Sequence, residues 1–219
     1  MKKKLLFSAL ILVLLCVIFI FLGLRQNAAP AGSTASQDNK EPITATLAVC
    51  GDIMSHSPQT NDAYDAATDT YSYLPCFQSV SSWIEAADYA VANFETTLNG
   101  PPYSGYPQFC APDALAYDLK TIGFDLVTTA NNHSMDKRMS GAVRTLDVLD
   151  GLGIDHVGTY RSAEERDKIY IKELNGMKIA FLSYTYGTNG IPVPEDWLVN
   201  RLDENLIKSD IAKAKALEP

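Results

Sequence analysis

The sequence feature that most constrains the fold is a short apolar strand that leads directly into a polar turn and then into a helix. Residues 124–128 form an apolar run rich in β-type residues, which predicts a buried strand. A polar stretch at residues 129–136 follows this strand. Helical spacing comes next, with apolar side chains at Met139, Val143, Leu146 and Leu149. Ligands of open α/β sheets bind where strands end and helices begin, so this turn is a candidate site in an α/β fold.

The polar turn holds residue types that bind metals and transfer protons. Asn132 offers an amide oxygen and His133 an imidazole, and both are competent ligands for a divalent metal. Asp136 lies three residues after His133, where its carboxylate can orient the imidazole ring. The alternative is a polar turn without a site, in which the asparagine caps the helix that follows.

Two other expected strands also end in acidic residues. The strand at residues 43–50 leads to Asp52, and the strand at residues 88–95 carries Asn93 and Glu95, which point to the same side of an extended segment. For either acidic residue alone, the alternative is a cap or turn residue. Oxygen ligands and an imidazole at three successive strand ends suit Mg, Mn, Fe or Zn in a hydrolytic site.

The remaining patterns extend the alternation of strands and helices. Further elements are expected as helices at residues 75–87, 112–122 and from 202 onward, a strand at 154–158, a hairpin at 169–184, and a solvated loop or weak helix at 61–73. The hairpin is indicated by its Asn175-Gly176 turn. This alternation places the chain in the α/β class.

The N-terminus predicts a membrane anchor. Residues 5–24 are 20 uncharged and almost entirely apolar residues, and about 20 such residues span a bilayer as a helix. Three lysines precede this run and orient the N-terminus toward the cytoplasm, with the rest of the chain outside. Residues 25–42 are typical of a flexible linker, so a folded domain is expected at residues 43–219. The alternative is a signal peptide cleaved at the A-x-A-like site at residues 29–31, which would release a secreted domain.

The charge of the chain limits its partners. The net charge is −8, but the first 37 residues carry four basic side chains and no acidic one. The remaining 14 basic and 26 acidic residues therefore have a net charge of −12. This balance argues against nucleic acid as a partner and against docking of the globular part on anionic lipid.

The other histidines and the cysteines give weaker signals. His56 shares a face with Asp52 if the intervening segment is helical, and otherwise it is a nearby loop residue. His156 has no acidic or metal-type neighbour at a useful spacing and is interpreted as structural. Cys76 and Cys110 lie in loop-like surroundings, where they either remain free or form a disulfide in an exported protein.

Four motifs together resemble a known bacterial family. They are Gly51-Asp52-Ile53-Met54, Asn93-Phe94-Glu95-Thr96, the stretch from Ala130 to Asp136, and the loop Gly187-Thr188-Asn189-Gly190. In this order they are similar to the CapA family of poly-γ-glutamate capsule biosynthesis proteins, over roughly residues 43–219. The resemblance implies a calcineurin-like metallophosphoesterase-type fold, an α/β/β/α sandwich. It also implies a membrane-anchored protein that faces outward.

The resemblance assigns roles to individual residues. It implies that Asp52, Glu95 and Asn132 bind metal and that His133 lies beside the reacting group, while Asp136 is added as its orienting carboxylate. The family continues with a His-Trp-Gly motif and later histidine pairs that supply the remaining ligands, and neither occurs in this sequence. We therefore expect an N-terminal fragment of a longer protein, whose domain lacks its C-terminal part.

The function that the resemblance implies is capsule biosynthesis or export at the cell membrane. We expect a metal-dependent, phosphoesterase-like hydrolase in the full-length form, with divalent Mn, Mg, Fe or Zn as cofactor. Poly-γ-glutamate and other capsule synthesis subunits are the expected partners, and nucleic acid is not. The alternative is a non-catalytic anchored subunit that binds or guides an anionic polymer.

Overall fold

A four-stranded parallel sheet forms the centre of the folded unit. The computed structural model describes residues 42–219, and residues 43–219 form one compact unit. The sheet has the order β1-β4-β5-β6, so strands adjacent in the sheet follow one another along the chain. Its strands are β1 (Leu47–Ile53), β4 (Tyr89–Phe94), β5 (Leu126–Thr128) and β6 (Asp155–Val157). The predicted strands at 88–95, 124–128 and 154–158 are thereby confirmed.

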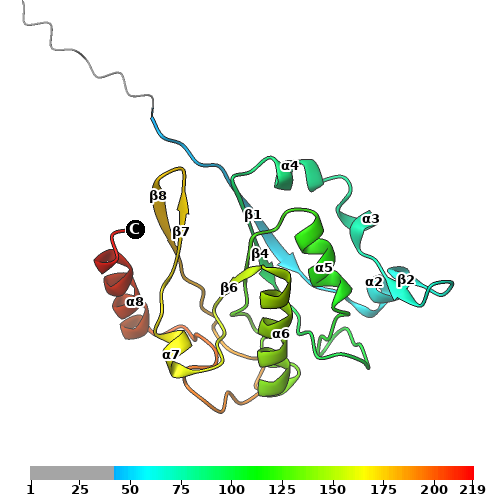
Figure 1. The fold of residues 1–219 in the computed structure, drawn as a ribbon. Helices are drawn as coiled ribbons and strands as arrows, with labels where there is room; N and C mark the ends of the chain where they lie inside the picture. Colours follow the sequence, from blue (N-terminus) through cyan, green and yellow to red (C-terminus); the bar gives the residue numbers. More distant parts are fainter. Residues whose placement is uncertain (1–41) are drawn as a thin grey trace, which may run out of the picture. The chain divides into compact units, whose positions relative to one another are not determined.

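Helices that connect the strands cover one face of the sheet, and the last helix of the described residues lies on the other side (Figure 1). They are α2 (Ser57–Asp62), α3 (Leu74–Phe77), α4 (Ser81–Glu85), α5 (Ala114–Thr121) and α6 (Arg138–Leu152), followed by α7 (Ala163–Arg166) and α8 (Glu204–Ala216). α6 ends at Gly153, which has a φ of 66° and adopts the left-handed conformation that glycine tolerates best. α8 begins after Asp203, whose side chain accepts a hydrogen bond from the backbone N–H of Leu206.

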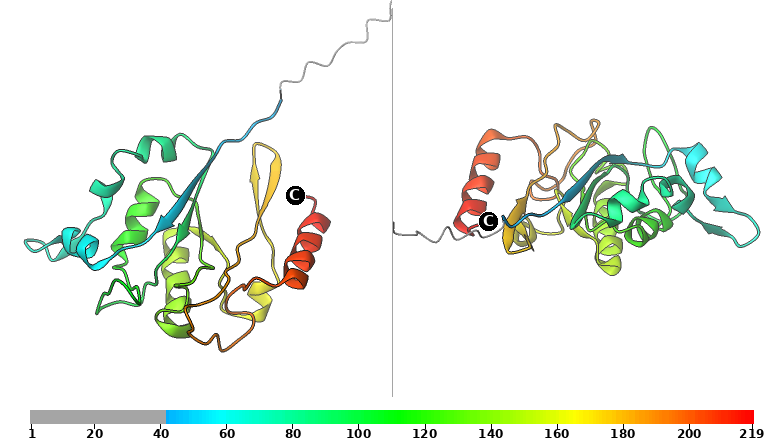
Figure 2. Two further views of the ribbon diagram at one scale, coloured as in Figure 1. Left: turned by 180° about the vertical axis from the view of Figure 1, so that it is seen from behind. Right: turned by 90° about the horizontal axis from the view of Figure 1, so that it is seen from above.

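The opposite face of the sheet is covered by a β-hairpin. β7 (Tyr170–Leu174) and β8 (Met177–Phe181) pair antiparallel around a turn in which Asn175 and Gly176 have φ values of 52° and 83°. Positive φ at both turn residues is what a two-residue type I′ turn requires, so the Asn-Gly prediction is confirmed. All views place the hairpin between α8 and the sheet, with α4, α5 and α6 beyond the sheet (Figures 1 and 2). The order of layers is α/β/β/α, as the fold prediction states.

β4 lies at the centre of both hydrophobic cores because alternate side chains of a strand point to opposite faces. Ala90, Ala92 and Phe94 belong to the cluster on the helical side. Tyr89 and Val91 belong to the cluster with the hairpin. A strand buried on both faces is continuously apolar, as this one is until it reaches its carboxyl end.

The strand expected at 43–50 is shifted to Leu47–Ile53, so Asp52 lies within β1 rather than after it. Two further predicted elements differ from the structure. The segment at 61–73 contains the end of α2 and a small ribbon of β2 (Tyr64–Asp65) and β3 (Thr70–Tyr71), where we expected a loop or weak helix. The single helix expected at 75–87 is divided into α3 and α4, and Trp83 of α4 is 78% exposed. Of the five residues of α4, only Ile84 is buried, which is too little apolar surface to hold a longer helix against the sheet.

The structure also bears on the cysteines and on membrane spans. Cys76 and Cys110 are both free thiols, the first exposed and the second buried, so the disulfide alternative is not realised.

In the described part of the chain, residues 42–219, no helix combines the length and the apolar character that crossing a bilayer requires. The anchor predicted at residues 5–24 and most of the linker at 25–42 lie outside the described residues.

Candidate active site

Strand register brings the first two candidate residues together. β1 and β4 are parallel, and after an irregularity between Val49 and Asp52 their register pairs Asp52 with Asn93. The Asn93 amide nitrogen donates to Asp52 Oδ1 at 2.9 Å and to Glu95 Oε2 at 2.9 Å. One carboxamide therefore bridges two carboxylates at the carboxyl end of the sheet.

The two carboxylates repel each other. Glu95 is 9% exposed, and burial raises the pKa of its carboxyl above the usual value. The negative charge of the exposed Asp52 raises this pKa further, whereas the nearby His133 and the Asn93 hydrogen bond lower it. Carboxylates that lie close together despite their mutual repulsion are typical of a functional site rather than of a contact that stabilises the fold.

The buried Asn131 fixes the geometry of the connection after β5. Its amide nitrogen donates to the Phe94 carbonyl at 2.9 Å and lies 3.2 Å from Asn93 Oδ1. Its side-chain oxygen accepts the backbone N–H of His133 at 3.0 Å. Asn131 therefore ties the imidazole-bearing turn to the end of β4. From the sequence we selected the neighbouring Asn132 as the candidate ligand and missed Asn131. The sequence signal for both residues was the same, namely their position after the end of a strand.

Asn132 occupies a different environment from Asn131. It is half-buried and lines a cavity of about 470 Å³ together with His133 and Asp136. α6 begins at Arg138 with Lys137 as its N-cap residue, so Asn132 does not cap this helix. The capping alternative for Asn132 is therefore wrong, and its role as a metal ligand stays a prediction.

His133 is held between an aspartate and an aromatic ring. The side chain is 8% exposed, and its Nδ1 lies 2.7 Å from Asp136 Oδ2. The Phe109 ring packs edge-on against the imidazole with centroids 4.6 Å apart. Hydrogen bonding to an ionised Asp136 requires the imidazole proton on Nδ1 and leaves Nε2 without one in the neutral ring. Nε2 lies 4.0 Å from Glu95 Oε1.

Asp136 is fully buried in this arrangement. Burial raises the pKa of its carboxyl, while the Phe109 backbone N–H, 2.6 Å from Oδ2, and the contact with His133 lower it. The other oxygen, Oδ1, is buried without a hydrogen-bond partner among the described residues. The structure thus places Asp136 where it orients His133, as the sequence predicts, and adds Phe109 as a residue that sequence reasoning missed.

The two remaining histidines lie outside the carboxylate cluster. His56 precedes α2, and its ring lies edge-on against Phe109 with centroids 4.8 Å apart. It therefore reaches the cluster through that ring rather than by sharing a helix face with Asp52. His156 Nε2 lies 3.0 Å from Asp150 Oδ1 at the other edge of the sheet. The expectation that His156 has no acidic neighbour is therefore wrong, and its structural role stays a prediction.

The central parallel sheet and its α/β/β/α layers are consistent with an α/β fold of the metallophosphoesterase type. The cluster lies at the carboxyl edge of the parallel strands, where ligands of such folds bind. The chain belongs to the bacterial capsule synthesis protein PGA_cap family, whose model matches residues 46–218. The family resemblance stated from the four motifs is thereby confirmed.

Curated relatives carry related names. Capsule biosynthesis protein CapA of Bacillus anthracis is 25% identical over 224 aligned residues, covering 98% of this chain and 52% of the relative. PGA biosynthesis protein CapA of Bacillus subtilis (strain 168) is 27% identical over 176 residues, covering 77% and 43%. Uncharacterized protein y4sH of Sinorhizobium fredii is 31% identical over 162 residues, covering 68% and 34%. The aligned part of this chain therefore spans between 34% and 52% of the length of these relatives.

The two neighbouring asparagines should respond differently to removal of the side chain. We expect Asn131→Ala to lower the free energy of unfolding by about 1–3 kcal/mol, because it leaves buried hydrogen-bonding groups unpaired. Asn132→Ala should change it by less than about 0.5 kcal/mol, since the half-buried amide faces a cavity. Urea denaturation of both variants measures the difference, and equal losses would contradict the site geometry described here.

Proposed function

We propose that the protein is a membrane-anchored, extracytoplasmic capsule-biosynthesis protein with a metal-dependent hydrolase-type site. The observation that carries the proposal is one continuous series of contacts. It runs from Asp52 through the Asn93 amide to Glu95. It continues from Glu95 to His133 Nε2, and from Nδ1 of the same ring to Asp136. The arrangement joins acidic ligand-type groups to an oriented imidazole.

The donor set suits a hard divalent cation. Among residues 42–219, no group of three or more His, Cys, Asp and Glu side chains is placed to hold a metal ion. The cluster nevertheless offers two carboxylates: burial, and then repulsion by Asp52, raises the pKa of Glu95, and a bound cation would relieve the repulsion. We propose Asp52, Glu95 and Asn132 as oxygen ligands for Mn, Mg, Fe or Zn.

The protein's own groups handle the proton. A divalent cation, when bound, supplies Lewis acidity toward a phosphoryl or acyl centre. Asp136 holds the proton on Nδ1 of His133 and so keeps the ring in one orientation. Nε2 is then available to accept a proton from an attacking group and to return it to a leaving group. The edge of Phe109 covers the imidazole and limits its contact with water.

Location and partners follow from the N-terminal sequence and the family. The apolar run at residues 5–24 anchors the protein in the cell membrane, and residues 43–219 face outward. Two relatives are named for biosynthesis of capsule or PGA. We therefore propose that the protein acts on or beside poly-γ-glutamate, with other capsule synthesis subunits as partners and without nucleic acid.

One observation favours a second, non-catalytic function. The Asn93 amide already bridges Asp52 and Glu95, so the two carboxylates are held together without a cation. In that case the site would serve binding, and the protein would be an anchored subunit that guides an anionic polymer. The net charge of −12 beyond residue 37 opposes direct polyanion binding, and metal ions would have to bridge the two.

Metal binding tests the site on which the first function depends. We expect the full-length chain to bind Mn²⁺ in isothermal titration calorimetry. Asp52→Asn and Glu95→Gln should each weaken binding at least about tenfold, because each removes a charged ligand. Glu85→Gln is the matched control, since Glu85 is an exposed carboxylate on α4. A folded wild-type protein that binds no Mn²⁺, or equal binding by all three variants, would contradict the metal site.

The anchor has its own test. We expect protein extracted from membranes to retain an N-terminus at or next to Met1, because residues 5–24 are longer than the apolar region of a cleaved signal peptide, which has about 7–15 residues. Intact-mass spectrometry of the extracted protein measures this. A mature N-terminus near Gly32 would instead show that the protein is secreted after cleavage.

A further inference from the structure

Phe109, a residue of a long loop, contacts both members of the His133–Asp136 pair. Its backbone N–H donates to Asp136 Oδ2 at 2.6 Å, and its ring packs edge-on against the His133 imidazole with centroids 4.6 Å apart. Phe109 is only 1% exposed, so the close packing around it leaves the imidazole little space to move on that side. The main chain of Phe109 therefore fixes the carboxylate, and its side chain fixes the imidazole.

The loop that carries Phe109 is the connection between β4 and α5, residues 95–113, which contains no helix and no strand. Such connections longer than about 12–15 residues are uncommon in compact domains and usually have a function when they are ordered. This loop is closed by its own contacts. Thr97 Oγ1 donates to the Phe109 carbonyl at 2.7 Å, and Cys110 forms isolated β-bridges with Thr97 and Ser104. These contacts hold Phe109 close to the end of β4.

α6 attaches to both ends of this loop. Arg144 donates to the two carboxylate oxygens of Asp113 at 2.8 and 2.7 Å, a bidentate geometry that fixes orientation as well as distance. Arg144 also donates to the Leu98 carbonyl at 2.8 Å, and the Leu98 N–H donates to Thr145 Oγ1 at 2.8 Å. The loop is therefore fastened to the helix that follows Asp136.

The start of α2 supports the loop from another side. The His56 ring lies edge-on against the Phe109 ring with centroids 4.8 Å apart. Gly105 approaches α2 so closely that an added Cβ would lie 2.5 Å from the Ser57 backbone nitrogen, and the Gly105 N–H donates to Ser57 Oγ at 3.3 Å. A side chain at position 105 would displace the loop from α2.

We propose that Phe109 is a positioning residue that keeps His133 in one orientation, and that Arg144 acts on His133 through it. The inference rests on the proposed function, because that function assigns proton transfer to Nε2 of this imidazole. Without the Phe109 ring, the imidazole can rotate away from Asp136, and its proton is then distributed between the two ring nitrogens. Arg144 acts on the imidazole through the loop whose two ends it binds.

The position of the proton on the His133 ring is directly measurable. The full chain, labelled with ¹⁵N and kept in EDTA, is observed in long-range ¹H–¹⁵N spectra of the imidazoles at a pH where the ring is neutral, with signals assigned by His133→Gln. In the wild-type protein we expect the proton on Nδ1, which lies 2.7 Å from Asp136 Oδ2. In Phe109→Leu we expect the Nδ1 signal to move toward that of an unprotonated nitrogen, because both tautomers are then populated.

Phe124→Leu is the matched control for lost packing. Phe124 is also 1% exposed, but it belongs to the core cluster on the helical side of the sheet. Its substitution removes a buried ring of the same size and should lower the free energy of unfolding by a similar amount. It should leave the His133 signals as in the wild-type protein.

A variant at the surface tests the attachment to α6 without disturbing buried packing. The Arg144 side chain is 38% exposed, so Arg144→Gln should fold, although it removes the bidentate contact with Asp113. We expect the Phe109 amide to exchange with solvent about tenfold faster, since the loop then opens more easily. The His133 Nδ1 signal should shift in the same direction as in Phe109→Leu.

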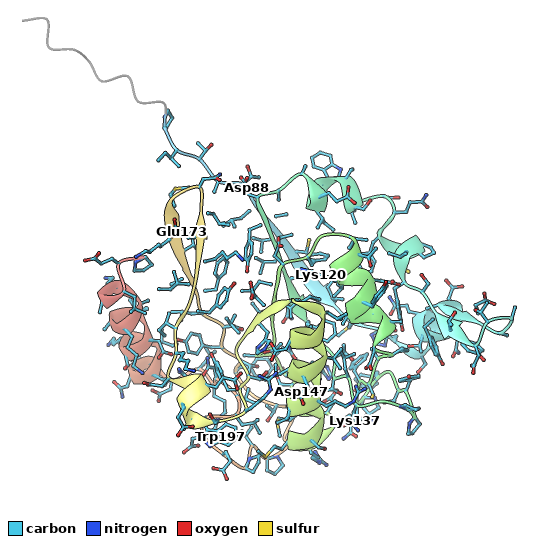
Figure 3. The ribbon with its side chains drawn as sticks, in the orientation of Figure 1. Asp88, Lys120, Lys137, Asp147, Glu173 and Trp197 are labelled. Carbon is cyan, nitrogen blue, oxygen red and sulfur yellow. The ribbon has the colours of Figure 1, made fainter. Side chains whose placement is uncertain are left out.

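Arg161→Gln is the matched control for the arginine. Arg161 pairs with Asp147 at 2.9 Å, and Figure 3 labels this aspartate on α6. The substitution breaks an ion pair of the same helix without removing a contact of the loop at residues 95–113. It should change neither the exchange of the Phe109 amide nor the His133 signals.

Three results would overturn the inference: a proton on Nε2 of His133 in the wild-type protein, wild-type His133 signals in both Phe109→Leu and Arg144→Gln, or equal shifts in the control variants. If Phe109→Leu does not fold, Arg144→Gln decides alone. Loss of Mn²⁺ binding with these shifts intact would remove the metal-dependent function and leave the positioning role. Unchanged signals with Mn²⁺ binding intact would remove the positioning role alone.

Discussion

The site depends on the register between β1 and β4, which sets Asp52 directly beside Asn93. The carboxyl ends of two parallel strands lie at the same edge of the sheet. There the Asn93 amide donates hydrogen bonds to both Asp52 and Glu95. A one-residue slip would turn these side chains toward the opposite faces. Burial of β4 between two hydrophobic cores opposes such a slip, so the packing of the sheet also fixes the spacing of the site.

The second half of the site is assembled by hydrogen bonds to backbone groups. Asn131 ties the turn after β5 to the Phe94 carbonyl, and Asp136 accepts the Phe109 N–H from the loop after β4. His133 is held between these two connections. Burial raises the pKa values of Glu95 and Asp136, so both carboxylates are kept in surroundings that disfavour their charge.

Local patterns predict much of the fold. The Asn175-Gly176 turn, the apolar strand before the 129–136 turn and the helical spacing from Met139 are each explained by local chemistry, and the structure contains all three elements. The division of the helix expected at 75–87 and the β2–β3 ribbon were missed. Only Ile84 of α4 is buried, and β2 and β3 have two residues each, which short-range periodicity does not report.

The individual roles in the site are harder to predict. Neighbouring asparagines have the same chemistry in the sequence, and only the three-dimensional contacts show that Asn131 supports the turn while Asn132 faces a cavity. Phe109 gave no signal, since a loop phenylalanine is an ordinary apolar residue until its ring is found against both His56 and His133. Contacts between segments more than 20 residues apart decide these roles, and periodicity contains no information about them.

The most direct test of the central claim is a crystal structure of the protein soaked in Mn²⁺, with anomalous difference maps recorded at the manganese absorption edge. The claim predicts a peak at the cluster that holds the three proposed oxygen ligands, Asp52, Glu95 and Asn132. A map without a peak there, in which Asn93 still bridges both carboxylates, would contradict the claim that this cluster is a metal-dependent site.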